Sequence, residues 1–131
     1  MPRFITNQFL SILKKINLKE KKILIFGATF KENCNDIRNS KSIELARILK
    51  RKRFNVDFFD PFVKKSYIEN FKNLKNLKKI KNKFYSAFFF NVRHKHFIKI
   101  DIDMLRRKLK SNGIIMDIKN IFPSSKTDFC L

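Results

Sequence analysis

A short apolar run, Ile23–Phe26, is followed directly by a polar segment, residues 27–40, and then by a stretch with helical spacing of apolar residues to about residue 51. The apolar run is typical of a buried strand. Asn39 or Ser40 is suited to cap the helix that follows. A buried strand that leads into a helix is half of a parallel β–α unit, so this arrangement restricts the chain to folds in which strands and helices alternate.

The same alternation continues along the chain. Residues 4–16 predict an amphipathic helix, and Asp101 or Asp103 caps a short helix that ends near Lys110. Further strands are predicted at residues 54–59, 85–92 and 114–118. We therefore predict an α/β fold, a three-layer sandwich in which a small, mostly parallel, Rossmann-like sheet has helices on both faces and is preceded by an N-terminal helix. With 131 residues, the chain is long enough for one core.

Residues 62–83 fit neither the strand pattern nor the helix pattern clearly. Leu74, Leu77 and Ile80 recur at every third position, and the lysines between Lys72 and Lys83 have no acidic residue among them. One interpretation is a basic helix that binds a membrane surface or nucleic acid. The other is the solvated face of a peripheral helix or loop. We favour the solvated face, because charge runs most often have that role.

The formal net charge of the chain is +20 at pH 7. Such a charge attracts nucleic acids, acidic membranes and phosphorylated ligands alike. Most of the basic residues are lysine, however, although arginine is the better bidentate partner for phosphate and guanine. Lysine, asparagine, isoleucine and phenylalanine are all abundant, as expected where AT-rich codons fill surface positions. We favour this compositional explanation, so nucleic acid is not the partner that we expect.

Several classes of protein are disfavoured by what the sequence lacks. No apolar run approaches the roughly 20 residues that a membrane span needs. The first residues have no apolar core and no small-residue cleavage site of a signal peptide. The two cysteines, Cys34 and Cys130, make neither a disulfide framework nor a zinc site. We therefore expect a cytoplasmic protein with no membrane span and no bound metal.

The polar segment after the first strand is the best candidate for a ligand site. It carries two cations, Lys31 and Arg38, around Asp36. Ligands of α/β proteins bind at the carboxyl ends of strands, and anions gain from the amides at the next helix N-terminus. The strand ends in the single Gly27, so the segment is not a glycine-rich dinucleotide fingerprint. Without those glycines, Asp60 before Pro61 is better explained as a turn residue than as a ribose ligand.

The segment Phe30–Ser40, Phe-Lys-Glu-Asn-Cys-Asn-Asp-Ile-Arg-Asn-Ser, resembles the F-K-x-N-x-x-D-x-R-x-S signature of nucleotide-sugar dehydrogenases. The signature belongs to the C-terminal, UDP-binding domain of the UDP-glucose/GDP-mannose dehydrogenase family. Val56–Pro61 resembles the family's V-x-V-Y-D-P, Val92–Phe97 its V-x-H-x-x-F, and Ile115–Lys119 its I-x-D-V-K. Met1–Phe4 is similar to the M-G-R-Y of its interdomain helix. The residues of the Phe30–Ser40 loop are most similar to those of the UDP-N-acetylglucosamine and UDP-N-acetylgalactosamine 6-dehydrogenases.

The resemblance implies roles for particular side chains. Lys31 would contact the nucleotide sugar, Phe30 would shape its pocket, and Lys119 is a further candidate for substrate contact. Arg38 would lie on the cofactor side and help to hold NAD, while Asp36 would order the loop. The plainer alternatives are that Phe30 is a core residue and that Arg38 and Asp36 form a surface ion pair of little energetic value. No catalytic residue is predicted.

The resemblance also divides the chain. Residues 1–20 would be the end of the interdomain helix, and residues 21–131 the UDP-sugar-binding C-terminal domain. The intact enzymes oxidise the C6 alcohol of a UDP-sugar to a carboxylate with NAD, using a catalytic cysteine in a part that this sequence does not match. We therefore expect Cys34 to be inert, His94 to be structural, and the chain alone to be inactive as a dehydrogenase.

The resemblance leaves the partners of the chain open. A UDP-sugar is the expected ligand, and a separate N-terminal dehydrogenase half or further copies of the chain are the candidate protein partners. Two functions of other classes remain as alternatives: a basic α/β module that binds nucleic acid, and a structural or oligomerisation subunit. The loop departs from the family pattern at Asn35, where a proline is usual, but it keeps the predicted ligand cations.

Overall fold

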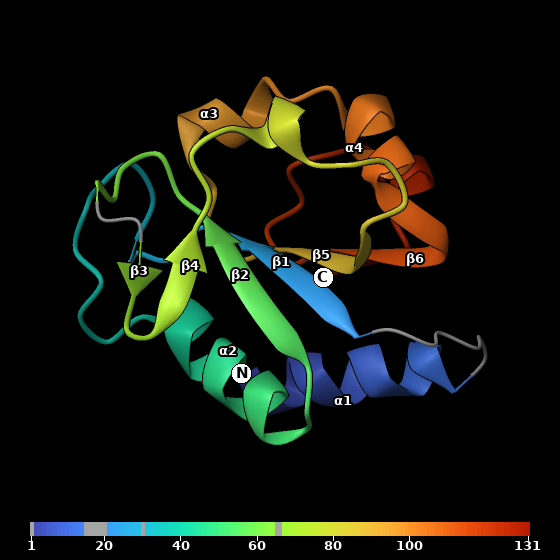
Figure 1. The fold of residues 1–131 in the computed structure, drawn as a ribbon, viewed down its shortest axis with the longest axis horizontal. Helices are drawn as coiled ribbons and strands as arrows, with labels where there is room; N and C mark the ends of the chain where they lie inside the picture. The colour runs from blue at the N-terminus through green and yellow to red at the C-terminus, as the bar shows by residue number, and fades with distance from the viewer. Residues whose placement is uncertain (1, 15–20, 30, 65–66) are drawn as a thin grey trace.

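The computed structural model describes residues 2–14, 21–29, 31–64 and 67–131. Its centre is a seven-stranded sheet with the strand order β3-β4-β2-β1-β5-β6-β7 (Figure 1). The elements are α1 Pro2–Leu13, β1 Lys22–Phe26, α2 Lys41–Arg51, β2 Asn55–Phe59, β3 Tyr67–Ile68, β4 Phe71–Asn73, η1 Leu77–Lys79, β5 Tyr85–Phe90, α3 Lys95–Ile98, α4 Ile102–Lys108, β6 Leu109–Asp117, η2 Ser124–Lys126 and β7 Phe129–Cys130.

The sheet is parallel except at one edge. β1 lies between β2 and β5, with Ile25 opposite Phe58 on one side and Phe89 on the other. The pairs β2–β4, β5–β6 and β6–β7 are also parallel, and among the strands that the structure describes only β3 runs antiparallel to its neighbour, β4. The prediction of a mostly parallel sheet is confirmed.

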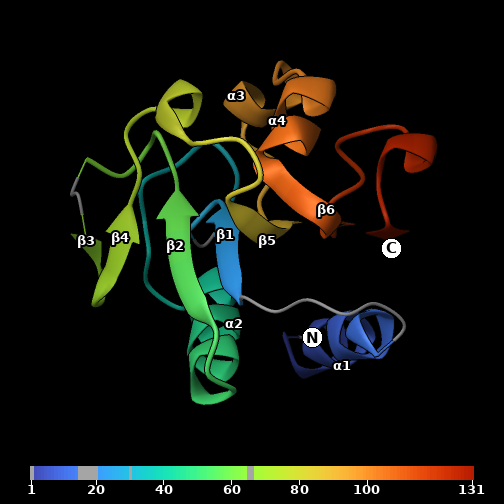
Figure 2. The ribbon, with the colours of Figure 1, turned by 45° about the vertical axis from the view of Figure 1, so that its right-hand side comes forward.

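Helices cover both faces of the sheet, because successive side chains of a strand point to opposite faces. Ile23 and Ile25 pack in the core cluster that α1 and α2 complete, whereas Leu24 and Phe26 pack in the cluster that α3 and α4 complete. Figures 1 and 2 show α1 and α2 below the sheet, and α3 and α4 above it. The predicted three-layer sandwich with an N-terminal helix is confirmed. Phe9 of this helix is fully buried against Phe89, so the helix belongs to the folded unit.

Helix caps were predicted better than element ends. Ser40 is the N-cap of α2, and its hydroxyl accepts a hydrogen bond from the amide of Ile43 at 3.3 Å. Asp101 caps α4 in the same way. The first helix spans Pro2–Leu13 within the described residues, whereas residues 15 and 16 of the predicted helix lie outside them. The last long strand begins at Leu109 rather than at residue 114, and the short elements β3, β4, α3 and β7 were not predicted.

The lysine-rich stretch from residue 62 to 83 contains no α-helix in its described part. It forms the β3–β4 hairpin and one 3-10 turn, η1, so the alternative of a basic amphipathic helix is wrong. Leu74, Leu77 and Ile80 are half-buried and pack against the α3–α4 side of the core. The lysines in the described part of this stretch are exposed, as the favoured interpretation predicts. Among the described residues, no helix is long and apolar enough to cross a membrane.

Gly27 occupies a position that a larger residue fits poorly. Its φ is +97°, a backbone conformation that side chains disfavour, and an added Cβ would lie 2.6 Å from the Cβ of Val92. This close approach joins the end of β1 to the end of β5.

We expect Gly27→Ala to lower the free energy of unfolding by about 2 kcal/mol or more, because it adds both backbone strain and a steric clash. Urea unfolding followed by circular dichroism measures the loss. The double variant Gly27→Ala/Val92→Ala removes the clash but keeps the backbone strain. Once the loss of unfolding free energy caused by Val92→Ala alone is subtracted, the double variant should be less destabilised than Gly27→Ala. An unchanged midpoint for Gly27→Ala would contradict the argument.

Candidate functional site

The loops at the carboxyl ends of β1 and β5 diverge. The loop after β1 leads to α2 on one face of the sheet, whereas the loop after β5 leads to α3 and α4 on the other face. Because β1 and β5 are neighbours, this is a topological switch point, and a crevice forms outside the strand ends there. The sequence therefore builds its polar segment, residues 27–40, into one wall of the position where open α/β sheets bind ligands.

A buried polar cluster joins the strand ends beneath this crevice. His94 and Asp60 are both fully buried at their side chains, and His94 Nε2 lies 3.0 Å from Asp60 Oδ2. The same carboxylate oxygen accepts the amide hydrogen of Ala28 at 2.7 Å. The hydroxyl of Thr29 lies 3.2 Å from His94 Nε2. These contacts connect the loops that follow β1, β2 and β5.

The hydrogen bonds of His94 define its tautomer, that is, which ring nitrogen carries the hydrogen. The amide of Asn33 donates to His94 Nδ1 at 2.8 Å, so Nδ1 is an acceptor. Nε2 must then carry the hydrogen, which it donates to Asp60. His94 is structural in this arrangement, as predicted. Asp60 also forms the predicted turn, because its other oxygen accepts the amide of Phe62 at 2.9 Å, but the turn explains only half of its contacts.

Asn33 is a residue that the sequence argument missed. It adopts the left-handed conformation with φ of 55°. Its side-chain oxygen accepts the amide of Lys95 at 2.8 Å, while its own amide binds His94. Asn33 thus ties the loop after β1 to the start of α3. The asparagine of the F-K-x-N motif was the available signal, since asparagine tolerates positive φ better than most residues.

Two of the predicted substrate residues line one hollow at the crevice. Lys31 comes from the loop after β1, and Lys119 follows the end of β6. The hollow has a volume of about 370 Å³, and its cations are Lys31, Lys41, Arg93 and Lys119, with Glu32 as its one carboxylate among the described residues. Ser42 from the first turn of α2 completes this wall. An anionic group in the hollow would meet the cations and lie near a helix N-terminus.

Asn91 supplies a polar atom that nothing in the described chain satisfies. It lines the same hollow, and its side-chain oxygen is buried without a hydrogen-bond partner among the described residues. Buried acceptors are nearly always paired, so an orphan of this kind marks a place for a donor. The hollow therefore suits a ligand that is anionic and also has an N–H or O–H group. The signal in the sequence was only that Asn91 follows a buried strand.

Arg38 lies apart from this hollow. Its side chain is 86% exposed and forms a two-pronged pair with Asp36, with Nη2 to Oδ2 at 3.0 Å and Nε to Oδ1 at 3.1 Å. The hydrogen bonds from the Arg38 side chain hold the pKa of Asp36 below its usual range. The surface ion pair that we weighed as an alternative is therefore present. The predicted contact of Arg38 with a cofactor stays a prediction, and Phe30 lies outside the described residues.

Known proteins resemble this chain along nearly all of its length. The profile of the UDP-glucose/GDP-mannose dehydrogenase family, UDP binding domain, matches residues 24–124. The UDP-N-acetyl-D-glucosamine 6-dehydrogenase of Salmonella typhi is 30% identical over 98% of this chain and 31% of its own length. The UDP-N-acetyl-D-mannosamine dehydrogenase of Methanococcus maripaludis is 35% identical over 95% of this chain and 29% of its own length. The chain thus spans less than a third of these relatives.

The fold is shared with solved structures. A UDP-D-ManNAc dehydrogenase from Pyrococcus horikoshii superposes with a TM-score of 0.80 over 98% of this chain and 30% of that protein, at 23% identity.

We expect His94→Ala to lower the free energy of unfolding by roughly 3 kcal/mol, because it leaves the buried Asp60 carboxylate and the Asn33 amide without their partner. The matched control is His96→Ala, since His96 is exposed on α3 and should cost less than about 0.5 kcal/mol. Urea unfolding of both variants gives the comparison. Equal losses for the two histidines would show that the buried cluster does not hold the strand ends together.

Proposed function

This chain belongs to the UDP-glucose/GDP-mannose dehydrogenase family, and we propose that its switch-point hollow binds the UDP part of a nucleotide sugar. The observation that carries the proposal is the convergence of Lys31 and Lys119 on one hollow at the carboxyl edge of the sheet. A diphosphate carries the charge that suits this hollow. The compact ammonium groups suit phosphate or sugar hydroxyl oxygens, which are acceptors.

The other polar groups of the hollow would fix the orientation of the ligand. Asn91 would accept a hydrogen bond from a ribose hydroxyl or from the uracil N–H, which are the donors that UDP offers. The first turn of α2 would face the diphosphate with its free amides. The buried cluster of Asp60 and His94 acts indirectly, because it holds the two loops that form the walls.

The names of the relatives support a UDP-N-acetylhexosamine as the whole ligand. In an intact enzyme of this family, bound NAD would supply the oxidising agent for the C6 alcohol of the sugar. The strand ends described here do not fit a dinucleotide-binding site. Asp60 stands at the position of a ribose-binding acid, but its side chain is buried and bonded to His94 and to the amide of Ala28. We propose that NAD is held mainly by another part of the protein, with Arg38 reaching it from the exposed side of the loop, and that α1 is the end of an interdomain helix.

We expect the double variant Lys31→Gln/Lys119→Gln to bind UDP about tenfold more weakly than the wild type, because it removes two charge-assisted contacts. Isothermal titration calorimetry measures the change. Lys14→Gln/Lys99→Gln is the control, since it loses the same charge from two exposed lysines that line none of the described hollows. If both double variants bound UDP equally weakly, the loss would be explained by the lower net charge alone, and the proposed site would be contradicted.

We also expect the purified 131-residue chain to produce no NADH from NAD and UDP-N-acetylglucosamine, although it binds UDP. The reason is that the hydrogen bond found for the Cys34 thiol among the described residues goes to the backbone carbonyl of Lys31, which cannot take its proton as a general base does. Absorbance of NADH at saturating substrate checks this. Steady NADH formation would show that the chain holds a complete active site.

A further inference from the structure

The connection from β4 to β5 crosses the sheet without a helix of its own. Residues 74–84 run over the α3–α4 face and contain only the 3-10 turn η1 (Figure 1). The connection is held in place from the side: Lys108 Nζ donates to the carbonyl of Ile80 at 2.7 Å, and the amide of Phe84 donates to the carbonyl of Lys108 at 2.8 Å. A hollow of about 450 Å³ lies between this connection and the strands.

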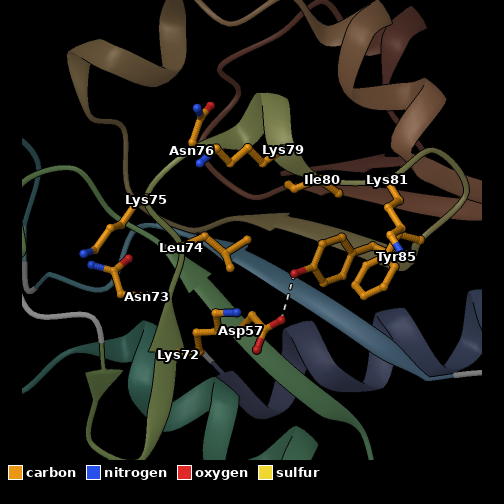
Figure 3. A pocket seen from close by; sticks show the side chains of 11 residues that line it. Asp57, Lys72, Asn73, Leu74, Lys75, Asn76, Lys79, Ile80, Lys81 and Tyr85 are labelled. Atoms are coloured by element: carbon orange, nitrogen blue, oxygen red, sulfur yellow. Dashed lines mark hydrogen bonds between the residues drawn. The ribbon is translucent and has the colours of Figure 1, made fainter.

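The floor of this hollow is apolar and ordered. Leu74, Ile80, Phe84 and Tyr85 line it, and the Tyr85 hydroxyl donates to Asp57 Oδ2 at 2.8 Å (Figure 3). Burial, and next the Asp57 carboxylate, raise the pKa of Tyr85, so the phenol keeps the hydrogen that it donates to Asp57. Phe84 packs edge-on against this ring at 5.0 Å between centroids.

Cations surround the floor. Figure 3 shows Lys72, Lys75, Lys79 and Lys81 on different sides of the hollow, around Leu74, Ile80 and Tyr85. All four are exposed, and none of them forms an ion pair with the described part of the chain. Asp57 is the one carboxylate that lines the hollow among the described residues, and it is engaged by Tyr85. The rim therefore keeps a net positive charge above an apolar, aromatic floor.

We infer that this hollow is a second ligand site, which takes a single nucleotide with its base on the floor and its phosphate at the lysine rim. A free inorganic anion would leave the apolar floor unused, and an uncharged ring would leave the lysines unused. Pockets of this size are typical of ligands larger than a simple ion. Tyr85 is 2% exposed and Lys22 Nζ lies over the Phe84 ring, 4.3 Å from its centroid. An aromatic base would therefore pack against the half-buried side chains of the floor, Leu74, Ile80 and the open part of Phe84.

The second site is separate from the proposed UDP site. It lies beside the middle of β2 and the beginning of β5, whereas the switch-point hollow lies at the carboxyl ends of β1, β5 and β6. The two hollows share no lining residue. Occupation of one does not require the other, so the inference stands whether or not the switch-point hollow binds UDP.

Calorimetric titration with AMP, with inorganic phosphate and with adenosine tests the inference on the full chain. We expect AMP to bind at least tenfold more tightly than either part alone, because only AMP uses both the floor and the rim. Lys79→Gln/Lys81→Gln should weaken AMP binding roughly fivefold, whereas Lys14→Gln/Lys99→Gln, with the same charge, should change it less than twofold. Lys31→Gln/Lys119→Gln should also leave it within twofold.

Amide spectra of the labelled chain locate the ligand. With AMP, we expect shifted signals to cluster in residues 72–85. The inference is wrong if AMP binds no more tightly than phosphate. It is also wrong if Lys79→Gln/Lys81→Gln and the control Lys14→Gln/Lys99→Gln weaken AMP binding equally, or if the shifted signals centre on Lys31 and Lys119. Binding of oligoadenylate more than a hundredfold tighter than AMP would overturn it in another way, because the surface would then follow a nucleic-acid strand rather than hold one nucleotide.

Discussion

The buried contact between Asp60 and His94 is the interaction on which the arrangement of the strand ends depends. A carboxylate without solvent is costly, and here it accepts hydrogen bonds from one imidazole N–H and from the backbone amides of Ala28 and Phe62. Those partners come from different loops, so satisfying the carboxylate fixes the positions of the loops after β1, β2 and β5 at once. Gly27, which has no side chain, allows the end of β1 to lie close to Val92. The hollow between these loops therefore has walls that are set by the interior of the protein.

Local signals in the sequence were sufficient for the main elements. The apolar run at Ile23–Phe26 and the mostly apolar run at Tyr85–Phe90 correspond to the neighbouring strands β1 and β5, and Ser40 and Asp101 start their helices as predicted. The elements that were missed have two to four residues, and their patterns are too short to give a period. β3 and β7, for example, exist because a neighbouring strand offers them hydrogen bonds, which no local sequence pattern shows.

The site was predictable in a different way. Position and charge identified the segment after β1 as a wall of an anion site, but Lys31 and Lys119 were connected only through the resemblance to a family. The contributions of Asn33 and Asn91 depend on contacts between distant parts of the chain and on an unsatisfied buried oxygen, neither of which a sequence displays. The sequence allowed two interpretations of Arg38, a contact with NAD and a surface ion pair with Asp36. The structure contains the ion pair.

The two outer strands of the sheet have a consequence for the behaviour of the chain in solution. A parallel sheet this rich in phenylalanine would be a template for aggregation if long edge strands were left open. β3 and β7, which form the two edges, have two residues each and so offer few free backbone groups to another chain. With a net charge of +20, copies of the chain also repel one another. Growth into fibres by strand addition is thus discouraged at both ends of the sheet.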